Sequence, residues 1–296
     1  MGRGISMAVA GVLLFSAKAV LVKLCYINDE DADALSTLFL RLLFSLPFYL
    51  IVLFRNEFRP KVAIANKDLL IFFGLGFLGY YLASYFDFLG LMYISASLER
   101  LILFIYPTIV ILFSRIFLKE HISRNQFIAI IISYIGLLLI FGDGLPSPTD
   151  GSSTDVLRGG LFIICAAITY AAYLVGSQWQ ISKYSANRFT PIAMLSACAV
   201  MMIHYVTVCG FKMPELSQEV YLYTFLMAIF STVLPSFLIA NAIEKVNAST
   251  VSIVGSLGPV STIVLSYIFL QEKISIVQGV GGLIIIAGVY FVKKKH

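Results

Sequence analysis

Runs of about 20 consecutive apolar residues recur along almost the whole chain, and they constrain the fold more than any other feature. A transmembrane helix needs about 20 mostly apolar residues to cross a hydrocarbon core of about 30 Å. Membrane-barrel strands are shorter and alternate in hydrophobicity, whereas these runs are continuous. The sequence therefore predicts an all-α membrane protein with ten transmembrane helices, at residues 4–26, 35–54, 69–90, 95–117, 124–142, 157–181, 190–209, 220–242, 247–270 and 274–292.

The composition excludes a water-soluble fold and a large soluble domain. Only 12% of the residues are charged and 59% are hydrophobic, whereas a soluble domain carries about 25% charged residues. Ten spans use about 200 of the 296 residues, which leaves little for loops. The first apolar run contains Lys18 and has no convincing cleavage site, so we expect a retained helix and not a signal peptide.

Basic residues are distributed unevenly between the two sets of predicted loops, and cytoplasmic loops are enriched in Lys and Arg. With the N-terminus inside, the external side receives only Arg158, Lys212 and Lys273. The cytoplasmic side receives 14 bases: Arg3, Arg55, Arg59, Lys61, Lys67, Arg115, Lys119, Arg124, Lys183, Arg188, Lys245, Lys293, Lys294 and Lys295. This bias predicts that both termini are cytoplasmic and that the loop Asp29–Asp33 is external. The net charge of +5 then reflects topology, and no nucleic-acid partner is expected.

The two halves of the chain repeat each other at a spacing of 152 residues. Ala96, Ser97, Pro107 and Glu120 recur as Ala248, Ser249, Pro259 and Glu272, and five further identities share this register. The unit has five helices, an odd number, so the second copy is inverted in the bilayer, as is typical of secondary transporters. We expect a first repeat at 1–142, an external linker at 143–156 and a second repeat at 157–296.

These features resemble the drug/metabolite transporter superfamily, in particular its ten-helix EamA-type permeases. The resemblance rests on the duplication, the Ala-Ser pairs, the interior prolines and the F-L-x-E loops at Phe117–Glu120 and Phe269–Glu272, and it covers essentially the whole chain. It implies a helical bundle around a central cavity, alternating access, and transport of small metabolites, often amino acids, across a bacterial inner membrane.

Six ionisable residues lie inside predicted spans, where a charge is costly and marks function: Lys18, Lys23, Arg41, Asp87, Glu99 and Arg100. Lys23 is expected to reach the interface. Arg41 either does the same or pairs with Asp87 or Glu99. Lys18 either lines the cavity or belongs to a buried ion pair. Glu99 and Arg100 are about 100° apart on one helix, so we expect them to face different surroundings.

If the four bases and two acids are ionised, the cluster carries +2, which favours anionic or zwitterionic solutes. Its charges have no counterparts 152 residues later, where Asp87, Glu99 and Arg100 correspond to Ile239, Val251 and Ser252.

Further residues complete the predicted site. Tyr81, Tyr170, Tyr173, Asn241 and Ser252 are candidates to line the cavity, and the alternative is ordinary interhelical hydrogen bonding or packing. Breaks in corresponding helices point to a transporter's binding site, so we expect hinges at Pro107, Gly255, Gly258 and Pro259. The alternative is a kink satisfied by packing. His204 has no Cys or Glu at helical spacing, so no metal site is expected.

We therefore expect a secondary transporter or exchanger that works without a cofactor or an ATPase partner, as a monomer or homodimer, with protons as a candidate coupling ion. No phosphate-binding G-x-x-x-x-G-K-[ST] motif occurs in the sequence. The alternative is a membrane-embedded enzyme that acts on a lipid or isoprenoid. Such an enzyme would need paired catalytic side chains, and only Asp87 and Glu99 are available as buried acids. A receptor or scaffold has no need of an inverted repeat.

Overall fold

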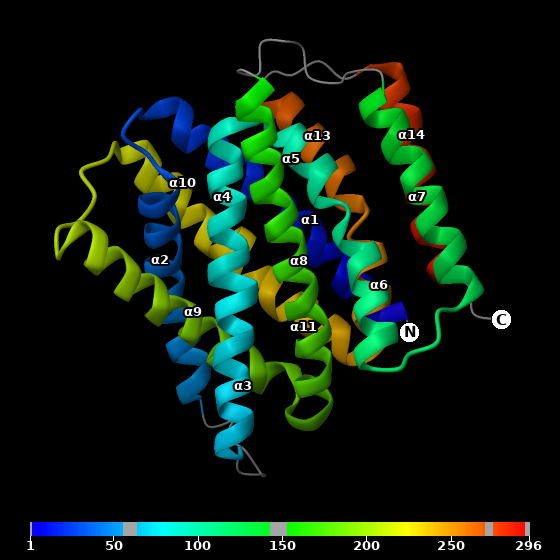
Figure 1. The fold of residues 1–296 in the computed structure, drawn as a ribbon, viewed down its shortest axis with the longest axis horizontal. Helices are drawn as coiled ribbons and strands as arrows, with labels where there is room; N and C mark the ends of the chain where they lie inside the picture. The colour runs from blue at the N-terminus through cyan, green and yellow to red at the C-terminus, as the bar shows by residue number, and fades with distance from the viewer. Residues whose placement is uncertain (1, 56–63, 143–152, 270–274, 294–296) are drawn as a thin grey trace.

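The computed structural model describes residues 2–55, 64–142, 153–269 and 275–293, and every regular element in these ranges is helical. Figure 1 shows the bundle. The first half contains α1 (Gly2–Asn28), α2 (Ala34–Phe54), α3 (Asn66–Gly76), η2 (Phe77–Leu82), α4 (Ala83–Tyr93), α5 (Ala96–Leu103), α6 (Tyr106–Phe117) and α7 (Arg124–Gly142). The second contains α8 (Ser153–Tyr184), α9 (Ala186–Cys209), α10 (Gln218–Ala228), η3 (Ile229–Val233), α11 (Leu234–Val246), α12 (Ala248–Val254), α13 (Leu257–Phe269) and α14 (Ile276–Lys293).

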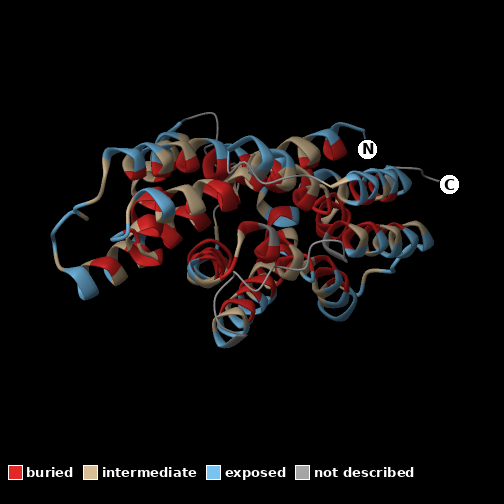
Figure 2. Ribbon diagram, turned by 90° about the horizontal axis from the view of Figure 1, so that it is seen from above, coloured by how far each residue is buried: buried red, intermediate tan, exposed pale blue. Residues whose placement is uncertain are grey.

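The described helices confirm an all-α membrane protein. Eight continuous or interrupted helices are long and apolar enough to cross a bilayer, and two shorter apolar helices, Arg124–Ile140 and Ile276–Phe291, occupy the fifth and tenth predicted positions. Most of the predicted linker at 143–156 lies outside the described residues. Figure 2 shows buried residues on the inner faces of the helices and exposed ones outside. Many exposed side chains are large and apolar, including Phe54, Leu138 and Leu283, as a surface in lipid requires.

The last helix of each repeat begins with the same capping box. At α7, the Gln126 N–H donates to Ser123 Oγ (3.2 Å), and the Ser123 N–H donates to Gln126 Oε1 (3.0 Å). At α14, Ser275 and Gln278 make the same two bonds at the same distances. Each box satisfies N–H groups that a helix start leaves without partners. Ser123 and Ser275 are 152 residues apart, so the box extends the sequence repeat.

Helices α7 and α14 occupy equivalent positions in the two repeats, and the contacts between them are symmetric as well. The two helices lie side by side and antiparallel (Figure 1). A Cβ at Gly136 would lie 2.6 Å from the Gly281 carbonyl oxygen, and one at Gly288 would lie 3.1 Å from the Ala129 carbonyl oxygen. Adding 152 to 136 and 129 gives 288 and 281, so the two contacts are equivalent with the helices exchanged. Small residues permit this close packing. A twofold axis that relates the two repeats would exchange α7 with α14 and would produce this pair of equivalent contacts.

Irregular backbone also recurs at equivalent positions. The π-helical turns η2 and η3 begin at Phe77 and Ile229, which are 152 residues apart. The helix formed by α5 and α6 is interrupted around Phe104 and Ile105, and the one formed by α12 and α13 is interrupted around Gly255 and Ser256. π-turns are often found at functional sites, and all four irregularities flank the centre of the bundle.

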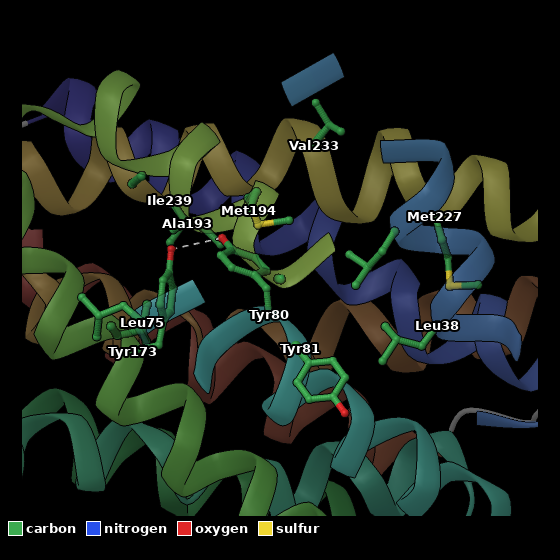
Figure 3. Packing of buried hydrophobic residues seen from close by; sticks show 14 of the residues in the cluster. Leu38, Leu75, Tyr80, Tyr81, Tyr173, Ala193, Met194, Met227, Val233 and Ile239 are labelled. Atoms are coloured by element: carbon green, nitrogen blue, oxygen red, sulfur yellow. Dashed lines mark hydrogen bonds between the residues drawn. The ribbon is translucent and has the colours of Figure 1, made fainter. Parts of the chain in front are cut away.

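The main hydrophobic core joins the two repeats. Figure 3 shows part of it, where Tyr80 of η2 and Tyr173 of α8 pack near Met194 of α9. The Tyr173 hydroxyl donates to the Tyr80 hydroxyl (3.3 Å), and the two rings meet edge to face. A Cβ at Gly79 would lie 2.1 Å from the Tyr173 ring, so only glycine allows α8 to approach η2 this closely.

Candidate functional site

Five of the six predicted intramembrane charges gather at the centre of the bundle, each no more than 5% exposed: Lys18, Arg41, Asp87, Glu99 and Arg100. They come from α1, α2, α4 and α5, so the first repeat supplies all of them. We call these five residues the charged cluster. Lys23 is half-buried and lies outside it. Three bases and two acids give the cluster +1 when all are ionised, and a buried charge of this kind requires compensation.

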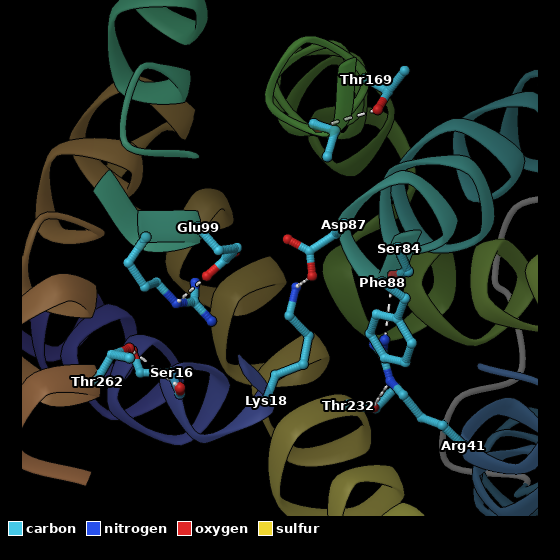
Figure 4. A network of polar contacts seen from close by, with 12 residues as sticks. Ser16, Lys18, Arg41, Ser84, Asp87, Phe88, Glu99, Thr169, Thr232 and Thr262 are labelled. Carbon is cyan, nitrogen blue, oxygen red and sulfur yellow. Dashed lines mark hydrogen bonds and ion pairs between the residues drawn. The ribbon is translucent and has the colours of Figure 1, made fainter. Parts of the chain in front are cut away.

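Lys18 and Asp87 form an ion pair across α1 and α4. The distance from Lys18 Nζ to Asp87 Oδ2 is 2.7 Å. The Lys18 ammonium also lies 4.8 Å from the centre of the Phe15 ring, one helical turn earlier. Of the two expectations for Lys18, the pair is present, and both residues also line a small cavity. The two roles are therefore compatible (Figure 4).

Glu99 and Arg100 form a second ion pair, which contradicts the expectation that they face different surroundings. The distance from Arg100 Nε to Glu99 Oε2 is 3.2 Å. The 100° separation applies to the backbone, and two long side chains can bend together across it, since an unpaired buried charge would be more costly. They lie in the short helix α5, whose start Ser95 caps by accepting from the Leu98 N–H (3.2 Å). Nη2 of Arg100 has no hydrogen-bond partner in the described part of the chain.

Arg41 neither reaches the membrane interface nor pairs with a carboxylate within the described residues. Its Nε donates to Thr232 Oγ1 (2.7 Å), and its Nη1 donates to Ser84 Oγ (3.3 Å). Its guanidinium lies 5.4 Å from the Phe88 ring centre. Thr232 belongs to the π-turn η3, so this side chain links the first repeat to the irregular helix of the second. The expected pairing with Asp87 or Glu99 is wrong, because two hydroxyls and an aromatic face surround the guanidinium.

The aromatic wall of the cluster comes from Phe15, Tyr106 and Tyr170. The Phe15 and Tyr170 rings are stacked with centroids 6.0 Å apart, and Tyr106 meets Tyr170 edge to face at 5.4 Å. Tyr170 was predicted from the sequence to line the cavity, whereas Phe15 and Tyr106 were not. Phe15 could have been found from its spacing, since it lies three residues before Lys18 and shares its helix face.

Two small cavities adjoin this wall. One of about 30 Å³ is lined by residues that include Ser16, Arg100 and Tyr106, and one of about 20 Å³ by residues that include Lys18 and Asp87. Phe15, Leu103 and Tyr170 border both. Such volumes hold a water molecule or two, and an organic metabolite requires more room. A ligand that occupies both cavities must therefore displace part of the aromatic wall.

The predicted hinge residues lie beside the first cavity. Gly255, Gly258 and Pro259 line it, and Pro107 is in the first turn of α6. The Tyr106 hydroxyl donates to the Ser252 carbonyl oxygen (3.4 Å), so the two interrupted helices touch at their breaks. A Cβ at Gly255 would lie 1.6 Å from the Tyr106 hydroxyl oxygen. Ser252 itself is buried, and its hydroxyl bonds the Ser249 carbonyl.

Three other predicted site residues have partners outside the cluster. Tyr81 hydrogen-bonds His204 Nδ1 of α9 (2.9 Å). Tyr173 belongs to the core contact with Tyr80 described above. Asn241 Nδ2 donates to Asn187 Oδ1 (2.9 Å) and thereby joins α11 to α9. The structure does not bring these three side chains to the charged cluster by any direct polar contact in the described residues.

Polar contacts also join the two repeats at the F-L-x-E loop of the first repeat. The carboxylate of Glu120 accepts hydrogen bonds from Gln178 Nε2 and Ser249 Oγ, and Gln178 Oε1 accepts from the Ala248 N–H (2.6 Å). Glu120 belongs to the F-L-x-E loop and Ala248-Ser249 to the repeated Ala-Ser pair. In the described residues, no group of three or more His, Cys, Asp or Glu side chains is arranged to hold a metal ion.

Comparison with known proteins identifies the fold and family. A model described as the EamA-like transporter family matches residues 2–142 and 157–293. The uncharacterized transporter YcbK of Bacillus subtilis is 28% identical over 293 residues, which cover 95% of this chain and 88% of that protein. An uncharacterized transporter of the archaeon Archaeoglobus fulgidus is 22% identical, over 96% of this chain and 95% of that protein.

A crystal structure at 13% identity has the same fold, with a TM-score of 0.74 over 98% of this chain and 96% of that one. The family resemblance, the membrane location and the two-repeat architecture are thus confirmed, and the relatives are named as transporters. The chain belongs to the EamA-like transporter family.

Proposed function

We propose that this protein is a secondary transporter or exchanger of a small anionic or zwitterionic metabolite, such as an amino acid, which it moves by alternating access at the interface between its repeats. The family supports transport in general. The finer proposal rests on the charged cluster, whose excess positive charge lies between α1, α2, α4 and α5 of the first repeat and η3 and α8 of the second.

The observation that carries the substrate class is the incomplete pairing of the buried guanidinium groups. Nη2 of Arg41 and Nη2 of Arg100 are both buried without a hydrogen-bond partner among the described residues. Arg100 also lines the cavity of about 30 Å³. A guanidinium binds a carboxylate well because its donors match the two carboxylate oxygens. A substrate carboxylate would neutralise the cluster, and an ammonium group could replace Lys18 beside Asp87.

The transport cycle that fits this site uses the repeat symmetry. In this proposal, ten helices cross the membrane, both termini are cytoplasmic, and the repeats comprise residues 1–142 and 157–296 with an external linker at 143–156. The broken helices at Pro107 and at Gly255, Gly258 and Pro259 act as hinges. The Glu120 contacts close the cytoplasmic end, and rocking of one repeat against the other would open it.

The proposal includes a coupling ion. Glu99 and Asp87 are the buried carboxylates of the cluster, and each lies beside a base: Asp87 is 2.7 Å from Lys18 Nζ, and Glu99 is 3.2 Å from Arg100 Nε. A substrate that changes these contacts changes the charge that the site tolerates, so a proton can be taken up or released as the substrate binds. Transport would then draw on a proton gradient, without nucleotide.

The test combines binding and flux. Purified protein is screened for thermal stabilisation by a panel of amino acids and small carboxylates, and any hit is then measured for flux in proteoliposomes. We expect stabilisation only by solutes with a carboxylate, and its loss in Arg100→Met. Arg158→Met is the matched control, because Arg158 is exposed near the start of α8 and lies outside the charged cluster. Stabilisation by cations or neutral solutes alone would refute the proposed substrate class.

A further inference from the structure

A much larger cavity than the two beside the charged cluster lies on the membrane-facing side of α8. It has a volume of about 690 Å³ and opens between α3 and α6, both of which pack on α8. Its lining is hydrocarbon except for the Thr169 hydroxyl and the Trp179 indole nitrogen, and it includes Leu75, Phe113 and Ala172. We call this cavity the α8 groove.

The α8 groove and the charged cluster lie on different faces of α8. Tyr170 stacks on Phe15 beside the cluster, whereas the neighbouring residue Thr169 lines the groove. Figure 4 shows Thr169 on the far side of its helix from Lys18 and Asp87. The Thr169 hydroxyl is already satisfied, since it donates to the Cys165 carbonyl (2.8 Å). The groove therefore offers apolar surface and no charge, which does not suit a polar metabolite.

The length of the groove matches one leaflet of a bilayer. Its lining on α8 runs from Ile168 to Trp179, about 16 Å at 1.5 Å per residue. Half of a hydrocarbon core is about 15 Å. Ile168 is near the middle of α8 and Trp179 is near its end, so the groove extends from the midplane to one interface. In the proposed topology this is the cytoplasmic interface.

A cationic side chain and an aromatic side chain of α8 lie at the interfacial end of the groove. Lys183 lies one turn beyond Trp179, with its ammonium 4.4 Å from the centre of the indole ring. Trp marks the level of the headgroups in membrane proteins, and bases at the cytoplasmic interface attract anionic lipids.

We infer that the α8 groove is a binding site for a phospholipid of the cytoplasmic leaflet. One acyl chain lies between α3 and α6 along α8, with its terminal methyl near Thr169, and its anionic headgroup lies beside Trp179 and Lys183. The chain fills apolar space that would otherwise lack contact partners. The lipid separates α3 from α6 and covers the face of α8 opposite the aromatic wall.

Photolabelling in vesicles tests this site. The protein is reconstituted in phosphatidylglycerol that carries a diazirine either near the terminal methyl or near the carboxyl of one chain, and cross-linked residues are mapped by mass spectrometry. We expect the terminal diazirine to label α8 near Thr169 and the carboxyl-proximal one to label near Trp179. Dilution with unlabelled phosphatidylcholine should compete less well than dilution with unlabelled phosphatidylglycerol.

Two kinds of variant sharpen the test. Ala172→Phe places a ring in the groove and should abolish the α8 labelling, whereas Val280→Phe adds the same ring to the lipid-facing surface of α14 and should not. Lys183→Gln should remove the preference for phosphatidylglycerol without changing the fold, and it remains informative if Ala172→Phe does not fold.

Each alternative result would overturn part of the inference. Labelling spread evenly over all lipid-facing helices, or labelling unchanged by Ala172→Phe in folded protein, would mean that the groove is no lipid site. The reverse order of labelling along α8 would assign the lipid to the opposite leaflet. None of these outcomes depends on substrate transport, so failure here is distinct from failure of the proposed transport function.

Discussion

Neutralising Lys18 should destabilise the protein through its partner. Lys18→Met leaves Asp87, which is 1% exposed, without the ammonium that lies 2.7 Å from its carboxylate. Removal of one partner of a buried ion pair costs about 3–5 kcal/mol, because the remaining charge is uncompensated. At about 2 °C per kcal/mol for a chain of this size, the melting temperature should fall by at least about 6 °C. Asp87→Asn in the same protein should restore most of this loss.

The assay is a double-mutant cycle measured by thermal melting in detergent. It compares the wild type, Lys18→Met, Asp87→Asn and the double variant, and the coupling energy isolates the pair. The pair formed by Lys183 and Asp68 gives a matched control. Its atoms are 3.4 Å apart and the Lys183 side chain is 41% exposed. Exposed pairs contribute about 0–1 kcal/mol, so Lys183→Met should shift melting by little.

Flux separates a structural role of Lys18 from a role in binding. The double variant is compared with Asp87→Asn, because Asp87 is itself proposed to meet the substrate. If Lys18 also contacts the substrate, the double variant transports less than Asp87→Asn. If the role of Lys18 is structural only, the two variants transport equally. Wild-type melting of Lys18→Met, or a double variant no more stable than the single one, would refute the assignment of this pair as a buried, mutually dependent unit.

Three further predictions follow from the topology and the polar contacts. In a background without native cysteines, a single cysteine at Glu30 should react with an impermeant maleimide from outside and one at Asn66 should not; the opposite pattern refutes the proposed orientation. Flux should respond to a pH gradient and lose this response in Glu99→Gln, whereas insensitivity to both would indicate a uniporter or a metabolite exchanger. Glu120→Ala removes the acceptor that holds Gln178 and Ser249, so amide hydrogen exchange at the start of α12 should accelerate, and unchanged exchange would mean that these contacts do not close that end.

Much of the architecture could be predicted from apolar length and from the repeat. Pro107 lies in the first turn of α6 and Pro259 lies near the start of α13, so each follows one of the two observed breaks. These positions suit proline, because it cannot donate a hydrogen bond within a helix. The π-turns η2 and η3 were not predicted. Phe77–Leu82 contains no proline, so η2 depends on how the helices pack. Pro235 follows η3 (Ile229–Val233) in the first turn of α11 and lacks an N–H donor, but a proline by itself does not specify a π-turn.

The candidate site, like the fold, was predicted from the sequence only in part. Its charges were found from the sequence, because ionisable residues within apolar runs are conspicuous. Their partners were not. Arg41 was expected either to reach the membrane interface or to pair with a carboxylate. It instead donates to the hydroxyls of Thr232 and Ser84, and Thr232 is 191 residues away in the chain. No local sequence pattern predicts a contact between residues so far apart in the chain.

The sequence by itself determined that this protein lies in a lipid bilayer, that it is helical, and that its two halves are related by an internal repeat. A chain with so few charges and so many long apolar runs must satisfy its backbone groups within helices in a bilayer, and an odd number of helices per repeat inverts the second copy. Only the tertiary structure decided which buried charges pair, which aromatic rings separate them and where α3 and α6 leave a groove. Those outcomes depend on the rotation and distance of helices that are remote in sequence, which no local pattern in the chain specifies.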